Sequence, residues 1–518
     1  MKSLKLPYLK IFLLLLIPLS GFAQNKKIEI LNADKLLGGN AMPNKARRLI
    51  GNVVFLHDGA KMYCDSAWFY SEENKLDAFG KVRIVQDSLD IKSKFLSYSG
   101  QNKMASLSGD VVLKDGQMTL YTDQLNYDRE NKVGYYTNGG KLVDPENTLT
   151  SIRGSYYSKT NTAFFSDSVR LKNIEYTMQS DTLIYNTESK RSEFAGETII
   201  KSDENTIICN RGWYNSSTEQ SSFYNRASFI KDGQSLLADS LYYNRNKQYS
   251  YAYKNVVLND TTEGISLYGQ TAEYWGLDGI SEVRDSAYLA IATESDSLYV
   301  HSDTFRIVED SLEEKDLFAY SGVRMFQSEM QGICDTMHYV GRDSMLYFLG
   351  DPVLWAGENQ LSAKFMKAKF VNGQVHKLFL DELAFLINLD SLENYNQVKG
   401  LSMRGYFRDN ELREIRVNGS AQSIYFAREE NNELVGVDFA KAARMKILVA
   451  GNEIQSVQYY QQVESDLKPE NEVKSSETSL EGFRWRSLER PTDRWDIFKF
   501  PSSALPIDSI QTPSDSLR

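Results

Sequence analysis

The residue types that most often carry chemistry are sparse in this 518-residue sequence, and their spacing is unlike that of known sites. No His-x-x-x-His or Cys-x-x-Cys pair, the spacing typical of zinc ligands, occurs. Gly140-Lys141 is no phosphate-binding loop, because Tyr135 and Leu142 stand where that motif needs a glycine and a hydroxyl residue. No Gly-x-Ser-x-Gly nucleophile elbow occurs either. We therefore expect no metal site and no cofactor. The histidines are scattered at His57, His301, His338 and His376.

Three cysteines, Cys64, Cys209 and Cys334, would invite a disulfide in an exported protein. Each falls one residue before a recurring polar position, and several repeats separate one from the next. In a linear stack of repeats that distance is far beyond the reach of a disulfide. We expect three small, buried, unpaired side chains.

The many carboxylates could in principle supply the acid and base of a glycosidase. However, Asp65, Asp123, Asp181 and Asp239 recur once per repeat, which is typical of a structural position. We therefore expect a protein that is not an enzyme.

A repeat of about 29 residues is the strongest signal in the sequence. The glycines at 51, 80 and 109 are each 29 residues apart. A polar residue, here called the polar anchor, recurs with nearly the same spacing and is followed four residues later by an aromatic residue in the first eight copies. The anchors are Asp65, Lys94, Asp123, Arg153, Asp181, Asn210, Asp239, Gln270, Asp303, Asp335 and Lys364.

Each repeat predicts two strands that bend near their middle. Apolar and small residues alternate from Leu76 to Ile84, with Gly80 at the centre. On the return strand the apolar parity changes after the anchor, as at Leu125 and Tyr127, so that strand must carry a bulge there. We predict an all-β fold: an elongated stack of antiparallel bent strands, a V-shaped, jelly-roll-like folded sheet with apolar residues between its two halves.

The N-terminus predicts export. Lysines precede the short apolar run from Ile11 to Leu19, and small residues at Gly21 and Ala23 offer a cleavage site. The net charge of −10 argues against nucleic acid as a partner. We expect a periplasmic protein, either free or associated with the outer membrane.

Composition and spacing suggest five segments. They are a signal peptide at 1–23, an N-terminal lead or cap at 24–46, the repeat stack at 47–395, a terminal β module or cap at 396–466, and a mostly irregular polar tail at 467–518. The tail contains two aromatic and basic islands, around Trp485 and Trp495, which either pack back on the sheet or dock a partner.

The signal peptide, the Gly-x-Val pattern, the Asp-Gly turns and the Asp-x-apolar-x-Tyr repeats together resemble the OstA-like family, most clearly over residues 45–250. That family includes the periplasmic bridge of lipopolysaccharide transport and the N-terminal domain of its outer-membrane assembly partner. The resemblance implies a folded sheet whose apolar interior shelters lipid acyl chains. It also implies lipopolysaccharide or a related lipid as ligand, and other transport proteins as partners through edge-to-edge sheet pairing.

Residues of inward parity are the candidate lining of such a groove. An alternative is that they fill a closed core, in a structural repeat scaffold that binds envelope proteins through its sheet edges and carries no lipid. The candidates are Met62, Phe69, Ile91, Leu96, Tyr98, Leu120, Leu125, Tyr127, Met178, Leu183 and Tyr185.

Overall fold

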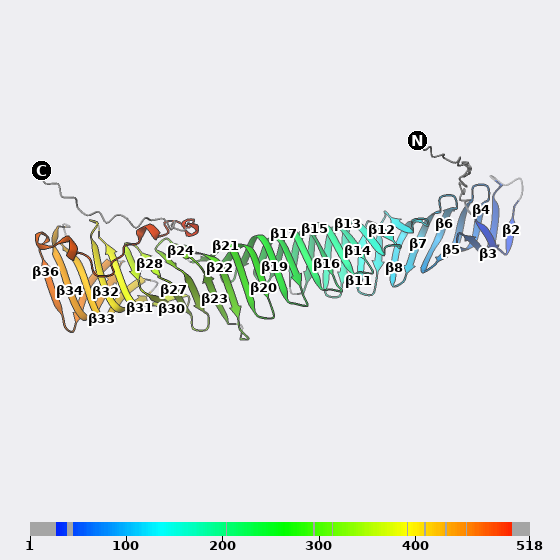
Figure 1. Ribbon diagram of the computed structural model, residues 1–518. Helices are drawn as coiled ribbons and strands as arrows, with labels where there is room; N and C mark the ends of the chain where they lie inside the picture. Colours follow the sequence, from blue (N-terminus) through cyan, green and yellow to red (C-terminus); the bar gives the residue numbers. More distant parts are fainter. Residues whose placement is uncertain are drawn as a thin grey trace, which may run out of the picture. The chain divides into compact units, whose positions relative to one another are not determined.

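The computed structural model describes residues 27–38, 45–203, 205–293, 296–312, 314–390, 392–408, 411–429, 433–451 and 453–499. Nearly all of these residues form antiparallel strands, so the all-β prediction is confirmed (Figure 1). Among them no helix is both long and apolar enough to cross a membrane. The signal peptide expected at 1–23 lies outside the described residues. The chain divides into two compact units, 1–174 and 175–518.

Unit 1 is a meander in which each long strand pairs with the one before and the one after it. After the strand β8 short strands take the place of the bent ones, and the last strand of the unit, β13, is long again. The strands are β1 (Glu29–Asn32), β2 (Lys35–Leu37), β3 (Arg47–His57), β4 (Ala60–Tyr70), β5 (Lys75–Gln86), β6 (Leu89–Ser99), β7 (Met104–Asp115), β8 (Met118–Asp128), β9 (Val133–Tyr136), β10 (Gly140–Val143), β11 (Asn147–Ser151), β12 (Arg153–Tyr157) and β13 (Thr162–Asn173).

Unit 2 continues the same antiparallel order and includes the strands of residues 396–466. Its first strands are β14 (Tyr176–Asn186), β15 (Arg191–Ser202), β16 (Thr206–Asn215), β17 (Gln220–Lys231), β18 (Gln234–Asn244), β19 (Tyr249–Asp260), β20 (Ile265–Trp275), β21 (Ile280–Ala292) and β22 (Ser297–Glu309). Short strands follow: β23 (Lys315–Tyr320), β24 (Val323–Gln327), β25 (Met330–Cys334), β26 (Thr336–Val340), β27 (Met345–Leu349), β28 (Val353–Ala356), β29 (Asn359–Ser362) and β30 (Phe365–Val371). The last are β31 (Gln374–Leu389), β32 (Tyr395–Arg408), β33 (Glu411–Arg428), β34 (Leu434–Ala450), β35 (Glu453–Tyr460) and β36 (Glu464–Lys468), before the 3₁₀ turns η2 (Glu470–Glu472), η3 (Ser475–Glu477), η4 (Ser487–Glu489) and η5 (Asp496–Phe498).

A bulge interrupts the pairing where each strand bends. Between β4 and β5 the register shifts from Tyr63/Arg83 to Ser66/Phe79, at the polar anchor Asp65 and at Gly80. Gly80 has φ +75°, and a Cβ on it would lie 2.6 Å from the Asp65 carboxylate. The anchor of one strand therefore covers the glycine of the next, and both predicted marks of the repeat meet at the bend.

The left-handed backbone at the bend persists where the glycine is missing. Asn225 and Arg226 have φ of 63° and 61°, and Lys254 and Asn255 have φ of 61° and 50°. Such conformations are costly for non-glycine residues, so the surrounding ladder must impose them. The stacking of strands thus fixes the bend, and glycine only makes it easier to form.

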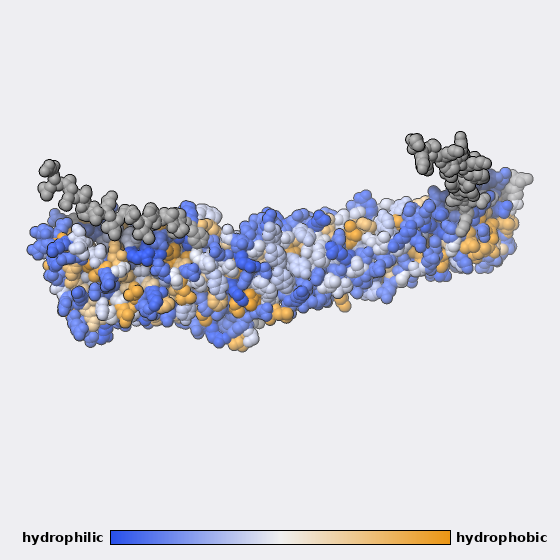
Figure 2. Space-filling model, viewed as in Figure 1, coloured by the Kyte–Doolittle hydropathy of each residue, from blue (hydrophilic) through white to orange (hydrophobic). Residues whose placement is uncertain are grey.

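The core of each unit lies on the inner face of the bent strands. In β8 the buried residues are Leu120 and Thr122 before the anchor and Leu125 and Tyr127 after it, which is the predicted change of parity. On the face seen in Figure 2, hydrophilic and hydrophobic side chains are interspersed.

Candidate functional site

Each bent strand has two halves, which we name after the bulge. Arm A is the half next to the Asp-Gly type of turn, and arm B is the half next to the Asn-Lys type of turn. In β6, arm A ends at Ser93 and arm B begins at Phe95. Inner side chains on paired strands are in register, so they form continuous rows along the stack.

In unit 1 the main arm-A row is apolar at every position and fully buried. From β3 to β8 it contains two kinds of residue, four after a bend glycine or three before an anchor. The row is Phe55, Met62, Ile84, Ile91, Leu113, Leu120, Leu142, Leu149 and Leu171.

The structure brings the unit 1 candidates together on this inner face. Met62, Ile91 and Leu120 belong to the arm-A row. The arm-B candidates are in register with one another through single intervening residues, as Tyr98 and Tyr127 are through Ala105. All of them, Met62, Phe69, Ile91, Leu96, Tyr98, Leu120, Leu125 and Tyr127, are buried.

The free ends of the two arms are fastened together in unit 1. Lys103 lies 3.1 Å from the Asp58 carboxylate and Lys132 lies 3.0 Å from Asp87, each pair joining an arm-B turn to an arm-A turn. Arg129, which is 4% exposed, donates hydrogen bonds to the carbonyl oxygens of His57 and Asp58. These contacts close the mouth between the arms over the buried rows.

Arg129 also reaches into the interior, where its guanidinium donates a 2.6 Å hydrogen bond to the Tyr98 hydroxyl. The same hydroxyl lies 2.6 Å from Nδ1 of His57. Burial raises the pKa of Tyr98 above its ordinary value, and the Arg129 charge opposes that rise. The Tyr98 hydroxyl therefore remains neutral and serves as a structural hydrogen-bonding group.

In unit 2 the candidates Met178, Leu183 and Tyr185 are also buried on the inner face of β14. The arm-A row continues in register from Met178 through Ile200, Ile207, Phe229, Leu236, Leu258, Leu267, Leu289 and Val300. Every position of this part of the row is apolar, as in unit 1.

The solvent exposure of the arm-A row differs along unit 2. From Ile200 to Leu258 its side chains are partly exposed, whereas Leu289 and Val300 are buried again. Ile200 occupies the same position of the repeat as Ile84, which is fully buried. Leu267 on β20 is buried as well. We call β15–β19 the open section, because here alone among the described long strands from β3 to β22 does solvent reach the arm-A row.

The arm-B side of the open section is a row of alternating aromatic and hydroxyl side chains. Tyr243 is 39% exposed and Tyr274 is 45% exposed, whereas Tyr98 and Tyr127 at the equivalent positions of unit 1 are 0% and 3% exposed. The row is Tyr185, Ser192, Tyr214, Ser221, Tyr243, Ser250, Tyr274 and Ser281. The open section thus has one apolar wall and one wall that carries phenol and serine hydroxyls.

Two contacts cross the mouth at the start of the open section. The rings of Tyr176 on arm A and Tyr214 on arm B meet edge to face at 5.9 Å. Glu175 and Arg245 form a 2.8 Å ion pair between the same two sides. Both partners of that pair are more than half exposed, so the pair contributes little to closure.

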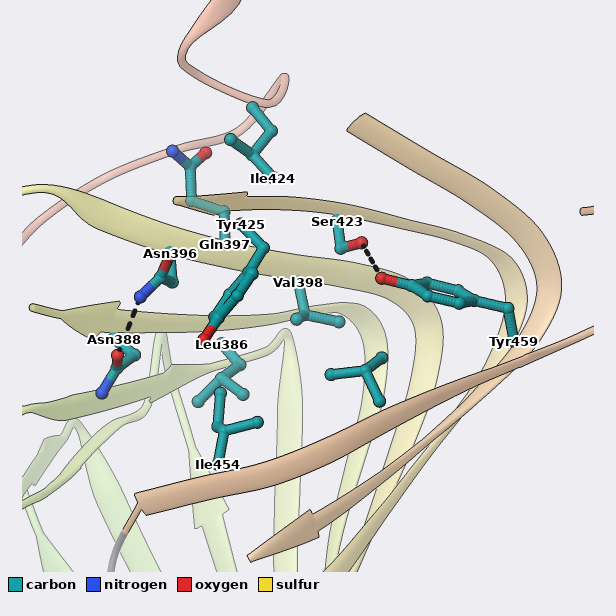
Figure 3. Close-up of a pocket in the computed structure, with 11 residues that line it drawn as sticks. Leu386, Asn388, Asn396, Gln397, Val398, Ser423, Ile424, Tyr425, Ile454 and Tyr459 are labelled. Atoms are coloured by element: carbon teal, nitrogen blue, oxygen red, sulfur yellow. Dashed lines mark hydrogen bonds between the residues drawn. The ribbon is translucent and has the colours of Figure 1, made fainter. Parts of the chain in front are cut away.

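At the other end of unit 2 the interior is filled. A cavity of about 10 Å³, the size of one water molecule, lies between β31, β32, β33 and β35. Figure 3 shows Leu386, Val398 and Ile454 at this cavity, with Ser423 hydrogen-bonded to Tyr459 at 3.1 Å beside it. This cavity has no room for a ligand larger than water.

No cluster of His, Cys, Asp or Glu able to hold a metal ion occurs within the described ranges. The three cysteines are free and buried. Burial raises the pKa of the Cys64 and Cys334 thiols to about 12 and that of Cys209 to about 11.

Sequence reasoning did not single out the open section, although a signal for it exists. The fastened turns of unit 1 pair an aspartate with a lysine 45 residues later. In the open section the residues at the same positions are Asp203 and Gln248, which cannot form an ion pair. The loss of this pairing is visible in the sequence.

Comparisons with known proteins agree with the repeat. Residues 25–181 match the sequence model of the OstA-like protein family, which confirms the resemblance over that range. The matches name no catalytic family. No curated protein sequence matches the chain. A crystal structure of LptH, the LptA-homologous periplasmic component of the lipopolysaccharide transport device of Pseudomonas aeruginosa, is 14% identical; the match covers 21% of this chain and 81% of that one, with a TM-score of 0.19.

Proposed function

We propose that this protein is a non-enzymatic carrier of lipopolysaccharide or a related lipid, which shelters the acyl chains in its apolar interior on the way to the outer membrane. The OstA-like match of residues 25–181 supports the transport role, because that family includes periplasmic lipopolysaccharide carriers. The predicted export signal supports a periplasmic location.

The open section carries the proposal. An arm-A row that is apolar in every repeat becomes accessible to solvent between Ile200 and Leu258. Each methylene of an acyl chain that moves from water to such a surface gains about 0.8 kcal/mol. The tyrosine and serine hydroxyls of arm B can face the polar part of the same molecule, since a tyrosine ring is apolar and its hydroxyl is not.

The eleven candidate residues predicted from the sequence belong to the same rows, but they lie where the rows are covered. We propose that lipid enters at the open section, and that the covered parts admit it only when the arms move apart. The dry scaffold is the competing function, and the burial of all eleven candidates favours it.

We further propose that other transport proteins bind at the edges of the stack, as the family resemblance implies. Among the described strands, the edge strand β1 pairs with β3 alone and the edge strand β36 pairs with β34 alone, and both are largely exposed. Each therefore offers unpaired main-chain groups to a neighbouring strand.

Photocrosslinking separates the carrier from the scaffold. Leu236 and Leu237 are neighbours in β18, are both partly exposed, and lie on opposite faces of the strand. A photoreactive amino acid at 236 is expected to capture lipopolysaccharide supplied in mild detergent, and the same group at 237 is not. Equal capture at both positions, or none at either, contradicts the proposed groove and favours the scaffold.

A further inference from the structure

Residues 478–498, here called the strap, run back along unit 2 from β32 to β22. In Figure 1 they are the orange to red segment above β32, β28 and β24. The Gln397 side chain accepts a hydrogen bond from the main-chain N–H of Leu480 and donates one to the carbonyl of Thr478, both at 2.8 Å. Gln360 pairs in the same way with the main chain of Arg484 and Arg486, at 2.7 Å for each bond. Two glutamines thus hold the strap by its backbone.

Side chains fix both ends of the strap. At the β32 end, Phe483 and Trp485 pack on Tyr395, with ring centroids 5.3 and 5.4 Å away. At the β22 end, Phe498 packs on Tyr288 and His301. The aromatic islands of the tail therefore pack on the stack.

Cationic side chains tie the middle of the strap to the same surface. Arg490 donates a hydrogen bond to the Gln331 side chain at 2.7 Å and one to the Gly357 carbonyl at 2.9 Å. Arg324, on β24, donates a hydrogen bond to the Glu489 carbonyl at 3.0 Å.

The strap lies on the outer face of arm A, opposite the inner row. Gln397 lies between Asn396 and Val398 in β32, and alternation along the strand sends its side chain to the other face. Figure 3 shows Gln397 and Ile424 directed toward the strap, while Leu386 and Val398 are directed inward. The strap therefore presses arm A from outside without entering the interior.

The arm-A row of unit 2 is buried wherever the strap lies over it, although Met178 on β14 and Leu267 on β20 are buried without it. The strap ends at Tyr288 and His301, on β21 and β22. From that point toward β32 the arm-A row is buried, for example at Val300 and Leu354, and on the other side of it lies the open section.

The strands under the strap, β24–β29, here called the braced region, are also where the fewest strands run continuously from arm A into arm B. In β14–β22 each strand runs through the bend, whereas between β23 and β30 separate short strands form the two arms. Arm A of this region consists of β24, β25, β28 and β29, which pair in that order. Few ladder bonds continue across the bend here, so an outside brace has most effect on this part of arm A.

We infer that the strap is a releasable brace: bound, it holds arm A of β24–β29 closed over the inner row, and released, it lets that arm open and extends the accessible row beyond the open section. One buried donor, Nε1 of Trp355 on β28, has no hydrogen-bond partner among the described residues. An unsatisfied buried donor costs free energy, so the closed form of arm A at β28 is less stable than its burial alone would make it. The role of the opened row in lipid carriage rests on the proposed function, but the brace itself does not.

The native cysteines report on the brace without any lipid. Cys334 lies on β25, inside the braced region, whereas Cys64 lies on β4 in unit 1 and Cys209 on β16 in the open section. In the double variant Gln360→Ala/Gln397→Ala, we expect the alkylation rate of Cys334 to rise at least tenfold and the rates of Cys64 and Cys209 to stay unchanged. Phe498→Ala, which removes one end contact, should give a smaller rise at Cys334. Gln270→Ala, at an exposed glutamine of β20, is the matched control and should change none of the three rates.

Adding the strap back as a separate peptide tests the same claim. Here both glutamines are kept, and a protease site placed in 470–476 allows the strap to be cut from the protein and removed. A synthetic peptide of residues 478–498, added to the cut protein, should then protect Cys334 from alkylation again. An unchanged Cys334 rate in the double variant, or an equal rise at all three cysteines, overturns the brace. A photoreactive amino acid in place of Leu361, on β29, then tests lipid carriage separately, because it measures capture of lipopolysaccharide at that position. Fast alkylation of Cys334 without capture of lipopolysaccharide at 361 upholds the brace and counts against lipid carriage.

Discussion

Lys103 lies 3.1 Å from the carboxylate of Asp58, 45 residues earlier in the chain, and Lys132 stands in the same relation to Asp87. The two ion pairs repeat because each arm-B turn reaches across the mouth to an arm-A turn formed earlier in the meander. Between them lies Arg129, which bonds to the turn carbonyls from inside. The mouth of unit 1 is thus fastened by two exposed contacts and one buried contact. We expect the buried contact to contribute more to the free energy of unfolding than either exposed one.

Arg129→Met is expected to destabilise unit 1 by about 2–4 kcal/mol, because it removes the buried hydrogen bonds that Arg129 donates to the Tyr98 hydroxyl and to the carbonyls of His57 and Asp58. Lys103→Met should cost less than about 1 kcal/mol, since partly exposed ion pairs contribute little. Native-state hydrogen exchange of β4–β8 measures both values. A larger effect at Lys103 than at Arg129 would show that the salt bridges, and not the buried guanidinium, close the mouth.

Gly80→Ala tests the bend. The positive φ of Gly80 and the approach of its added Cβ to Asp65 should together cost about 1–3 kcal/mol. The second change Asp65→Ala should recover only the part due to the clash, because the backbone strain remains. Full recovery in the double variant, measured by hydrogen exchange of β4 and β5, would contradict a contribution from backbone conformation.

The cysteines predict a pH dependence. Burial raises the pKa of Cys64 and Cys334 to about 12 from the ordinary value of 9.0. The folded form therefore binds the thiol proton more tightly than the unfolded form, so this contribution to stability is complete below pH 9 and is lost as the pH rises toward 12. At pH 8 the low thiolate fraction alone should make alkylation of either cysteine roughly 1000-fold slower than in the chain unfolded in urea. Mass spectrometry of iodoacetamide-treated protein measures both rates, and equal rates would refute the assigned burial.

Much of the fold could be predicted because a single repeat determines it. The spacing of Gly80 and Asp65 located the bend, and the change of parity between Leu120 and Leu125 located the bulge. The bend at Asn225 could not be found in this way, because there the neighbouring strands impose a left-handed backbone on residues that do not favour it.

The candidate site was harder to predict than the fold. Ile84 and Ile200 follow the same local pattern, and only contacts between distant turns make one buried and the other accessible. The strap is a second example, since nothing in the spacing of Gln360 and Gln397 indicates that both bind the main chain of a tail about 80 to 125 residues later. Contacts at such sequence separations leave little trace in local patterns.

Gln248→Lys should fasten the open section. Gln248 occupies the turn position of Lys103 and Lys132, and it shares their positive φ, at 46° against 56° and 57°. A lysine there would face Asp203, the counterpart of Asp58, and would restore the missing ion pair. Because an exposed pair contributes at most about 1 kcal/mol, it should shift the open section toward closure by no more than about fivefold.

The consequence for lipid carriage follows from that shift. Capture of lipopolysaccharide by a photoreactive group at 236 should fall up to about fivefold in Gln248→Lys, and high salt should restore it, because salt screens exposed charges. Gln248→Met, of similar length but uncharged, is the control and should leave capture unchanged. If the lysine variant captures as much lipid as the wild-type chain at low salt, access at β15–β19 does not depend on the separation of the two arms.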